Sequence, residues 1–290
     1  MGAADLVPGV SGGTVALVLG IYRRLITAIR CGAGALASLV RFDGSEFIRR
    51  MTEVEWRFFI PLLVGIGLAV VSLSHLIESL LESQPVRMAG LFFGLVAGSI
   101  VVAWRLVDRR DMLRLTILAA AAVATFILLG FGAGPVAAPA WWMYIGAGAL
   151  AICAMILPGI SGSFLLLMVG MYTAVLGAVN DRDLVAIGLV AFGAVVGLAA
   201  FSTLLNALLD RYQDEVMAAL VGLMAGSLRV LWPWPEGTEG TTLGSPSTDA
   251  VWPVVLAVAG AAVVLVVARR EEAIAHRVDD AADEAAEVAP

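Results

Sequence analysis

The chain is poor in the residues on which soluble and catalytic proteins depend. It has no lysine, so all 18 basic residues are arginines, and charged residues make up only 14% of the sequence. Its two cysteines, Cys31 and Cys153, supply no disulfide framework. With only two histidines, His75 and His276, these cysteines cannot build a metal site. The sequence therefore predicts neither a bound metal nor any other cofactor.

Apolar residues take the place of the missing charges. They make up 60% of the chain, and the mean hydropathy is +0.95. The apolar stretches are long and continuous instead of alternating, which favours membrane-spanning helices over a barrel. We therefore expect an all-α polytopic membrane protein. Stretches long enough to cross a bilayer are 58–81, 86–107, 115–132, 184–209, 216–232 and 251–268.

The arginines indicate how these spans are oriented. Seven lie in the linker 23–57, four lie in the loop 105–114, and Arg269 and Arg270 follow the last span. The positive-inside rule places these three regions in the cytoplasm. The loops 132–140 and 233–250 contain no basic residue and are bordered by tryptophans, so we expect them outside. The acidic segment 269–290 is expected to be a solvated, partly disordered cytoplasmic tail.

One short motif occurs twice within apolar sequence. Pro-Gly-Val-Ser-Gly at 8–12 returns as Pro-Gly-Ile-Ser-Gly at 158–162, and a Gly-x-Tyr follows each copy at the same offset of 150 residues. Lipid cannot satisfy the backbone groups that proline and glycine release, so such breaks persist only inside protein or beside a cavity. Two breaks in matching positions indicate a transporter binding site at the middle of the membrane.

A second stretch repeats as well. Residues 74–104 align without gaps on 202–232, at an offset of 128, with 11 identities in 31 positions. Counting crossings places the two copies in opposite orientations, which is typical of the inverted-topology repeats of secondary transporters. The small-residue pairs Gly94/Gly98 and Gly222/Gly226 are expected to mediate close helix packing.

These repeats divide the chain into five parts. We expect a first transmembrane repeat at 1–110, a connecting helix and external loop at 111–140, and a second, inverted repeat at 141–232. An external loop with the last helix occupies 233–268, and the acidic tail follows at 269–290. The second motif has an apolar arm before it, at 141–154, whereas the matching arm of the first would lie upstream of Met1.

Each motif is expected to form an unwound turn followed by a re-entrant helix that begins near its serine. Proline suits the head of a helix, and glycine permits tight turns. The first N–H groups of such a helix have no partner within it and attract anions. We therefore expect a site for a phosphate at the two motifs, formed by Pro8, Gly9, Ser11, Gly12, Gly13, Thr14, Pro158, Gly159, Ser161, Gly162 and Ser163.

Few other polar residues fall within the apolar stretches. Asp5 is either a proton relay or cation ligand for ion coupling, or the cap of a helix. Arg229 either meets a phosphate or extends toward the external headgroups. His75 and Glu78, one helical turn apart, either line the transport pathway or mark an exposed helix end.

The stretch from Ala3 to Tyr22 resembles the opening signature of the polyprenyl-phosphate transporter (PopT-type) family, a membrane family formerly described as a domain of unknown function. Pro-Gly-Ile-Ser-Gly-Ser at 158–163, with its trailing Gly-Met-Tyr, is similar to that family's second signature. The resemblance extends over Gly2 to about Trp232. It implies a flippase that returns undecaprenyl phosphate, or a related polyprenyl phosphate, from the outer to the cytoplasmic leaflet for carrier-lipid recycling. The positions that carry the resemblance are Asp5, Pro8, Gly9, Ser11, Gly12, Gly13, Thr14, Pro158, Gly159, Ser161 and Gly162.

Two alternatives remain open at this stage. A membrane polyprenyl-diphosphate phosphatase would share the Pro-Gly-x-Ser core, but here no arginine lies within either motif and no histidine lies beside them as a base. A carrier for a small soluble anion would need a path lined by polar residues along its length, and these spans offer few.

Overall fold

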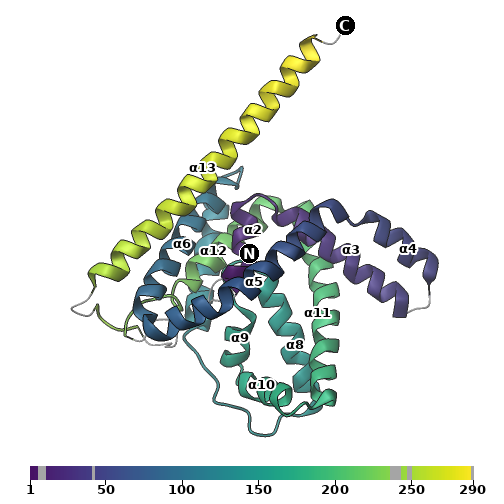
Figure 1. Cartoon of the computed structure of the whole chain (residues 1–290), viewed down its shortest axis with the longest axis vertical. Helices are drawn as coiled ribbons and strands as arrows, with labels where there is room; N and C mark the ends of the chain where they lie inside the picture. Colours follow the sequence, from purple (N-terminus) through teal and green to yellow (C-terminus); the bar gives the residue numbers. More distant parts are fainter. Residues whose placement is uncertain (6–10, 41–42, 236–242, 247–249, 289–290) are drawn as a thin grey trace.

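The structure is a computed structural model that describes residues 1–5, 11–40, 43–235, 243–246 and 250–288. These residues form α-helices joined by turns, with no β-strand among them (Figure 1), which confirms the all-helical fold class. The helices are α1 Gly2–Asp5, α2 Gly12–Val18, α3 Tyr22–Val40, α4 Gly44–Glu53, α5 Trp56–Ser83, α6 Pro85–Arg105, α7 Met112–Leu128, α8 Trp141–Ile156, α9 Gly162–Met168, α10 Tyr172–Asn180, α11 Leu184–Arg211, α12 Gln213–Ser227 and α13 Val251–Val288.

The long apolar helices make this a multi-pass membrane protein. Within the described residues, four helices are long and apolar enough to cross a bilayer: α5, α6, α11 and the first part of α13, Val251–Arg270. The helices α9 and α10 form a further apolar pair that bends by 114° at a short break. α7 and α8 are apolar but shorter. The stretch expected to span at 216–232 contains α12, which already ends at Ser227.

Glycines bring two pairs of helices into close contact. On α6, a Cβ atom added at Gly94 would overlap the backbone of Ala257 on α13, and one at Gly98 would lie 3.0 Å from Ala261. On α12, a Cβ atom at Gly226 would lie 2.5 Å from the carbonyl oxygen of Ala122 on α7. Gly222 packs in the same way one turn earlier. The predicted packing role of the four glycines is confirmed. In each helix pair, residues further along one helix contact residues further along the other, so the two helices run parallel.

The helices α8 and α11 form a third parallel pair. Gly193 of α11 packs on Ile145, and Gly197 packs on Ala149 one turn later. The short helix α1 contacts α5 in a similar way, through Gly2 at Ile66. None of the apolar window of α5 is fully buried, although Ile77 and Leu81 pack against the core. We attribute this exposure to contact with lipid, since the exposed side chains are apolar.

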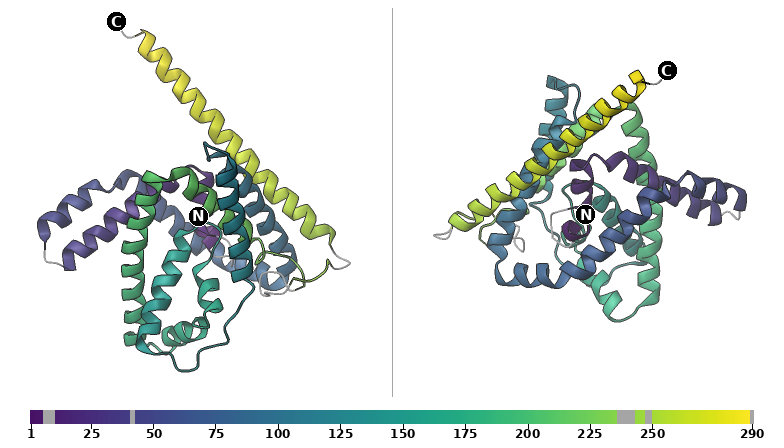
Figure 2. Two further views of the ribbon diagram at one scale, coloured as in Figure 1. Left: turned by 180° about the vertical axis from the view of Figure 1, so that it is seen from behind. Right: turned by 45° about the horizontal axis from the view of Figure 1, so that its top comes forward.

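The linker 23–57 is more ordered than the sequence suggests. α3 packs against both α11 and α4, and the α3–α4 hairpin projects from the side of the bundle (Figures 1 and 2). Asp43 caps α4 by accepting a hydrogen bond from the N–H of Glu46, at 3.1 Å. Glu46 in turn accepts from Arg49 and Arg50 on the next turn.

The expected disordered tail is also helical. α13 continues past Arg270 to Val288 and extends well beyond the other helices (Figure 1). Alanine and glutamate are the commonest residues of this segment, and both favour helix. The expectation of a partly disordered tail was therefore wrong for the described backbone.

The core lies where α2 meets the larger helices. Leu17 of α2, Ile26 of α3, Val96 of α6, Leu209 of α11 and Met224 of α12 are all at most 1% exposed and belong to one buried cluster. The first motif helix is therefore held at the centre of the protein.

Candidate functional site at the junction of the two motifs

A short helix follows the serine of each motif. α2 begins one residue after Ser11, and α9 begins one residue after Ser161. Each helix ends at a glycine of positive φ, at +66° for Gly20 and +73° for Gly170, where the chain turns into the next helix. Only glycine adopts this backbone region without strain, which explains why the Gly-x-Tyr element follows both motifs.

The first motif helix lies directly against the second motif. The Ser11 hydroxyl donates to the carbonyl oxygen of Met155 at 3.0 Å, and it accepts from the N–H of Gly13 at 3.1 Å. The Thr14 hydroxyl oxygen accepts from the N–H of Gly159 at 2.9 Å. The Tyr22 hydroxyl donates to the carbonyl oxygen of Ile156 at 3.2 Å. The segment from Ser11 to Tyr22 is thus in contact with the end of α8 and the second motif, although 134 to 145 residues separate the bonded partners in sequence.

These bonds satisfy groups that the break in α8 releases. Carbonyl groups at the end of a helix have no partner within it, and lipid provides none. Ser11 and Tyr22 supply donors to two such carbonyls, and Thr14 supplies an acceptor to the N–H in the turn. Side chains of one half therefore complete the backbone of the other half.

The motif residues are enclosed by protein. Ser11 and Thr14 are each 2% exposed and Ser161 is 9% exposed, whereas Ser163 is exposed. The hydroxyl oxygens of Ser161 and Ser163 lie 2.9 Å apart within hydrogen-bonding distance. In this conformation the buried hydroxyls are engaged with protein groups, so binding a phosphate requires some of these bonds to exchange.

Close approach explains the glycines at the junction. A Cβ atom on Gly13 would lie 2.8 Å from the carbonyl oxygen of Ile156. Gly159 has a φ of +86°, and a Cβ atom there would lie 2.8 Å from the Ser227 hydroxyl on α12. Pro158 beside it is fully buried. The second motif is therefore packed between α2 and α12.

Some of the predicted site residues lie elsewhere or outside the described part. Pro8 and Gly9 lie outside the described residues, as does the side chain of Asp5, whose backbone ends α1. The His75 and Glu78 side chains lie on exposed α5, with His75 Nδ1 3.8 Å from a Glu78 oxygen. The guanidinium of Arg229 stacks on the ring of Phe126 on α7, at 4.7 Å.

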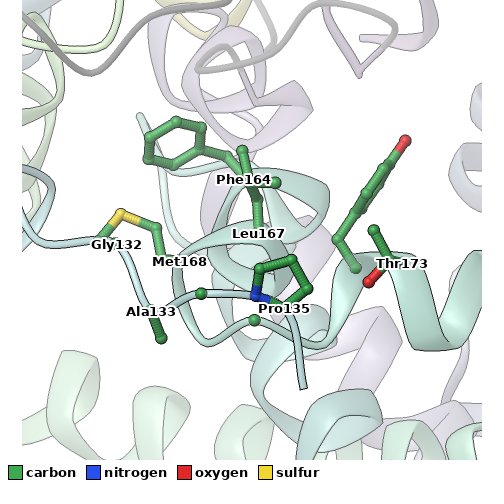
Figure 3. Close-up of a pocket in the computed structure, with 10 residues that line it drawn as sticks. Gly132, Ala133, Pro135, Phe164, Leu167, Met168 and Thr173 are labelled. Carbon is green, nitrogen blue, oxygen red and sulfur yellow. The ribbon is translucent and has the colours of Figure 1, made fainter. Parts of the chain in front are cut away.

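Tyr22 takes part in the junction, although no role was predicted for it from the sequence. Its signal was the repeated Gly-x-Tyr, since Tyr22 and Tyr172 share the offset of 150 residues. The hydroxyl of Tyr22 completes the junction, whereas Tyr172 lines a cavity of about 220 Å³ at the far end of α9. Figure 3 shows this cavity between the loop at Gly132–Pro135 and the side chains of Phe164, Leu167 and Met168.

The chain matches the family model described as undecaprenyl phosphate translocase-like over residues 1–247. It belongs to this family. A relative from Vibrio cholerae serotype O1, named polyprenyl-phosphate transporter, is 40% identical over 81% of this chain and 76% of its own length. A relative of the same name from Staphylococcus aureus is 30% identical over 89% of this chain and 88% of its own length. No solved structure matches the chain.

The family match covers the part of the chain that forms the junction. The matched region, 1–247, includes both motifs and every helix from α1 to α12. The family description names a translocase, which favours transport over the phosphatase alternative.

Proposed function

We propose that this protein transports polyprenyl phosphate, of the undecaprenyl type, from the outer to the cytoplasmic leaflet of the cell membrane. The family description and the names of both relatives support this lipid as the substrate. The observation that carries the proposal is the contact of the first motif helix with the end of α8 and the second motif through the buried hydroxyl groups of Ser11 and Thr14. A protein that only anchored lipids would have no need for paired helix breaks in its interior.

In the proposed mechanism the phosphate replaces protein groups at the junction. When α2 separates from the end of α8, the O–H of Ser11, the O–H of Tyr22 and the N–H of Gly159 lose their partners. Each unsatisfied buried donor costs about 1–3 kcal/mol. A phosphate oxygen can accept from these donors, and such bonds are strong where water is excluded. The lipid headgroup therefore stabilises the separated state relative to the empty protein.

The proposal includes opening to alternate sides of the membrane. The aligned glycines of the two halves pack in parallel pairs, α6 with α13 and α12 with α7, which supports two inverted repeats. Ion pairs from Arg23 to Asp210 and from Arg114 to Glu215 join the arginine-rich segments in one polar layer. This layer is cytoplasmic in our proposal, as is the C-terminus, and the prenyl tail stays in lipid while the headgroup crosses.

Coupling to an ion remains part of the proposal. Asp5 is the acidic residue nearest to the first motif in sequence, and a proton or cation bound there would alter the charge beside the headgroup. The second motif has Met155 at the matching position, so the coupling would act on one half only.

The test is transport in reconstituted vesicles of known protein orientation. A labelled undecaprenyl phosphate is placed in one leaflet, and its arrival in the other leaflet is followed with and without a pH gradient. We expect exchange to be faster than in protein-free vesicles and faster than for the uncharged polyprenol. Equal rates with and without protein would contradict the proposal. Release of inorganic phosphate from a prenyl diphosphate would instead identify a phosphatase, and uptake of free phosphate alone would identify an anion carrier.

A further inference from the structure

A second cavity adjoins the first motif helix on its other side. It has a volume of about 310 Å³ and lies between α1, α2, α5, α6 and α13. Thr14 and Val18 of α2 form one wall, Phe92 and Val96 of α6 form another, and Val264 of α13 closes the third. The cavity is open on one side, where its lining residue Val263 is 57% exposed, so an apolar chain can enter it from the surrounding lipid.

The lining of this cavity selects for hydrocarbon. Among its described lining residues no side chain is charged, and the only hydroxyl groups are those of Thr14 and Ser99. Thr14 accepts from the N–H of Gly159, and Ser99 donates to the carbonyl oxygen of Leu95 in its own helix. Aliphatic and aromatic groups therefore make up the rest of the wall, which offers nothing to retain a phosphate or a metal ion.

The cavity and the junction share one residue. Thr14 lines the cavity and also bonds to the second motif, so a lipid whose phosphate sits at the junction has its first carbons beside this opening. In a prenyl phosphate, branched hydrocarbon follows the phosphate directly. The polar junction and the apolar cavity beside it match these two parts of the lipid in the same order.

We propose that this cavity binds the isoprene units next to the phosphate of the transported lipid. The inference rests on the proposed function, because it takes the junction as the headgroup site. Lipid tails are as apolar as the cavity wall, so entry brings no hydrophobic gain. Discrimination comes from packing, since branched isoprene methyl groups fill the space between Val, Leu and Phe side chains better than a straight acyl chain does. The cavity thereby gives the protein its preference for prenyl phosphates over phospholipids.

The cavity in Figure 3 lies at the matching place in the other half. Phe164 and Met168 line it, and they stand at the offset of 150 residues from Thr14 and Val18. Both motif helices thus have a hollow on the same face. The cavity at α2 is the larger of the two and is the one to which we assign the isoprene units.

The direct test is photochemical labelling of the full-length protein in vesicles. The probe is a farnesyl phosphate that carries a diazirine in the isoprene unit next to the phosphate. We expect labelled peptides to come from α2 and the middle of α6, and undecaprenyl phosphate to compete the labelling away. Labelling of α11, which does not line the cavity, as strong as that of α2 and α6 would overturn the inference. Equal labelling of the cavity by a diazirine phosphatidylcholine that undecaprenyl phosphate does not displace would also overturn it.

A matched pair of variants provides an independent measurement. Val264→Phe places a ring in the cavity, whereas Val266→Phe makes the same change two residues along α13, where the valine is 52% exposed and does not line the cavity. We expect Val264→Phe to weaken probe labelling at least tenfold and Val266→Phe to label as the unchanged protein does. Equal labelling of both variants would contradict the inference.

The outcomes separate this inference from the proposed function. Vesicles that move undecaprenyl phosphate while the probe avoids the cavity would overturn the tail site and leave the transport proposal intact. Competed labelling of the cavity without any leaflet exchange would support the tail site and contradict transport.

Discussion

At the scale of single residues, three side chains of the first half act as substitutes for missing backbone partners. Ser11, Thr14 and Tyr22 bond to Met155, Gly159 and Ile156, where α8 ends and the chain turns. A soluble protein would leave these backbone groups to water. In a membrane they need protein donors and acceptors, and this need ties the two halves together.

Removal of the Thr14 hydroxyl should therefore destabilise the fold. Thr14→Val keeps the shape of the side chain but leaves the buried N–H of Gly159 without its acceptor, at a cost of about 1–3 kcal/mol. Thr203→Val is the matched control, because Thr203 is exposed and its hydroxyl bonds only within its own helix, to Ala199. Thermal unfolding in detergent measures the difference. Equal melting temperatures for the two variants would show that the junction bond contributes nothing.

Some residues of the candidate site could be predicted from the sequence, and others could not. The repeated motif pointed to Ser11, Thr14 and Ser161 because serine and threonine are rare companions of proline and glycine inside apolar sequence. A role for Tyr22 was not predicted, because a tyrosine in an apolar stretch is equally typical of a membrane interface. The partner atoms on Met155 and Ile156 are backbone carbonyls, which no residue type reveals.

At the scale of helices, glycine positions determine how closely pairs approach. Gly94→Ala should push α6 away from α13, because the added methyl group would overlap the backbone of Ala257. Overpacking of this kind costs about 1–3 kcal/mol. Gly65→Ala on α5 is the control, since nothing lies within 4 Å of its added Cβ atom and alanine favours helix over glycine by about 1 kcal/mol. We expect a lower melting temperature for the first variant and an equal or higher one for the second. The reverse order would contradict the assigned helix packing.

The helix α4 should be sensitive to acid. Hydrogen bonds from Arg49 and Arg50 lower the pKa of Glu46 to about 2. Because folding lowers this pKa, the Glu46 carboxylate stabilises α4 fully at pH values above 4.5, the ordinary pKa of a glutamate. This contribution is lost as the pH falls from 4.5 toward 2. Hydrogen exchange over Gly44–Glu53, corrected for intrinsic rates, should show protection falling in that range. Glu46→Gln should reduce the pH dependence and leave the part that comes from the capping carboxylate of Asp43, whose pKa is lowered by the hydrogen bond from the N–H of Glu46. An undiminished dependence in that variant would contradict the assignment.

Helix positions followed from hydropathy where the apolar run was continuous. The expected span at 58–81 lies within α5, and the one at 184–209 lies within α11. Hydropathy did not reveal α3 and α4, because their arginines made the segment read as a polar linker. It also missed the helical course of α13 beyond Arg270, where propensity outweighs charge.

At the scale of the whole molecule, the topology makes a prediction that labelling can check. Ala138 lies in the uncharged loop before α8 and Ser45 lies in α4, and both are exposed. In a protein with Cys31→Ser and Cys153→Ser, an impermeant thiol reagent should reach Ala138→Cys from outside the cell and Ser45→Cys only from inside. Reaction of both from one side, or in the reverse sense, would exclude the inverted topology.

The order of helices could be predicted from the sequence, but their spatial pairing could not. Matching glycines in 74–104 and 202–232 indicated that α6 and α12 occupy equivalent places. They did not indicate that the partners are α13 and α7, because neither partner carries a matching motif. Likewise the repeated Pro-Gly-x-Ser pointed to a shared site, whereas the cavity beside α2 depends on side chains from five separate helices.

The most direct test of the motif junction is the rate of leaflet exchange of labelled undecaprenyl phosphate by Ser11→Ala combined with Ser161→Ala. Ser72→Ala is the control, because the Ser72 hydroxyl is exposed and bonds to Leu68 in its own helix, at 2.6 Å. We expect the double variant to remain folded, as judged by gel filtration in detergent, and to lose at least tenfold in exchange rate while the control keeps the full rate. A folded double variant that exchanges lipid as fast as the unchanged protein would contradict the assignment of the headgroup to the paired motifs.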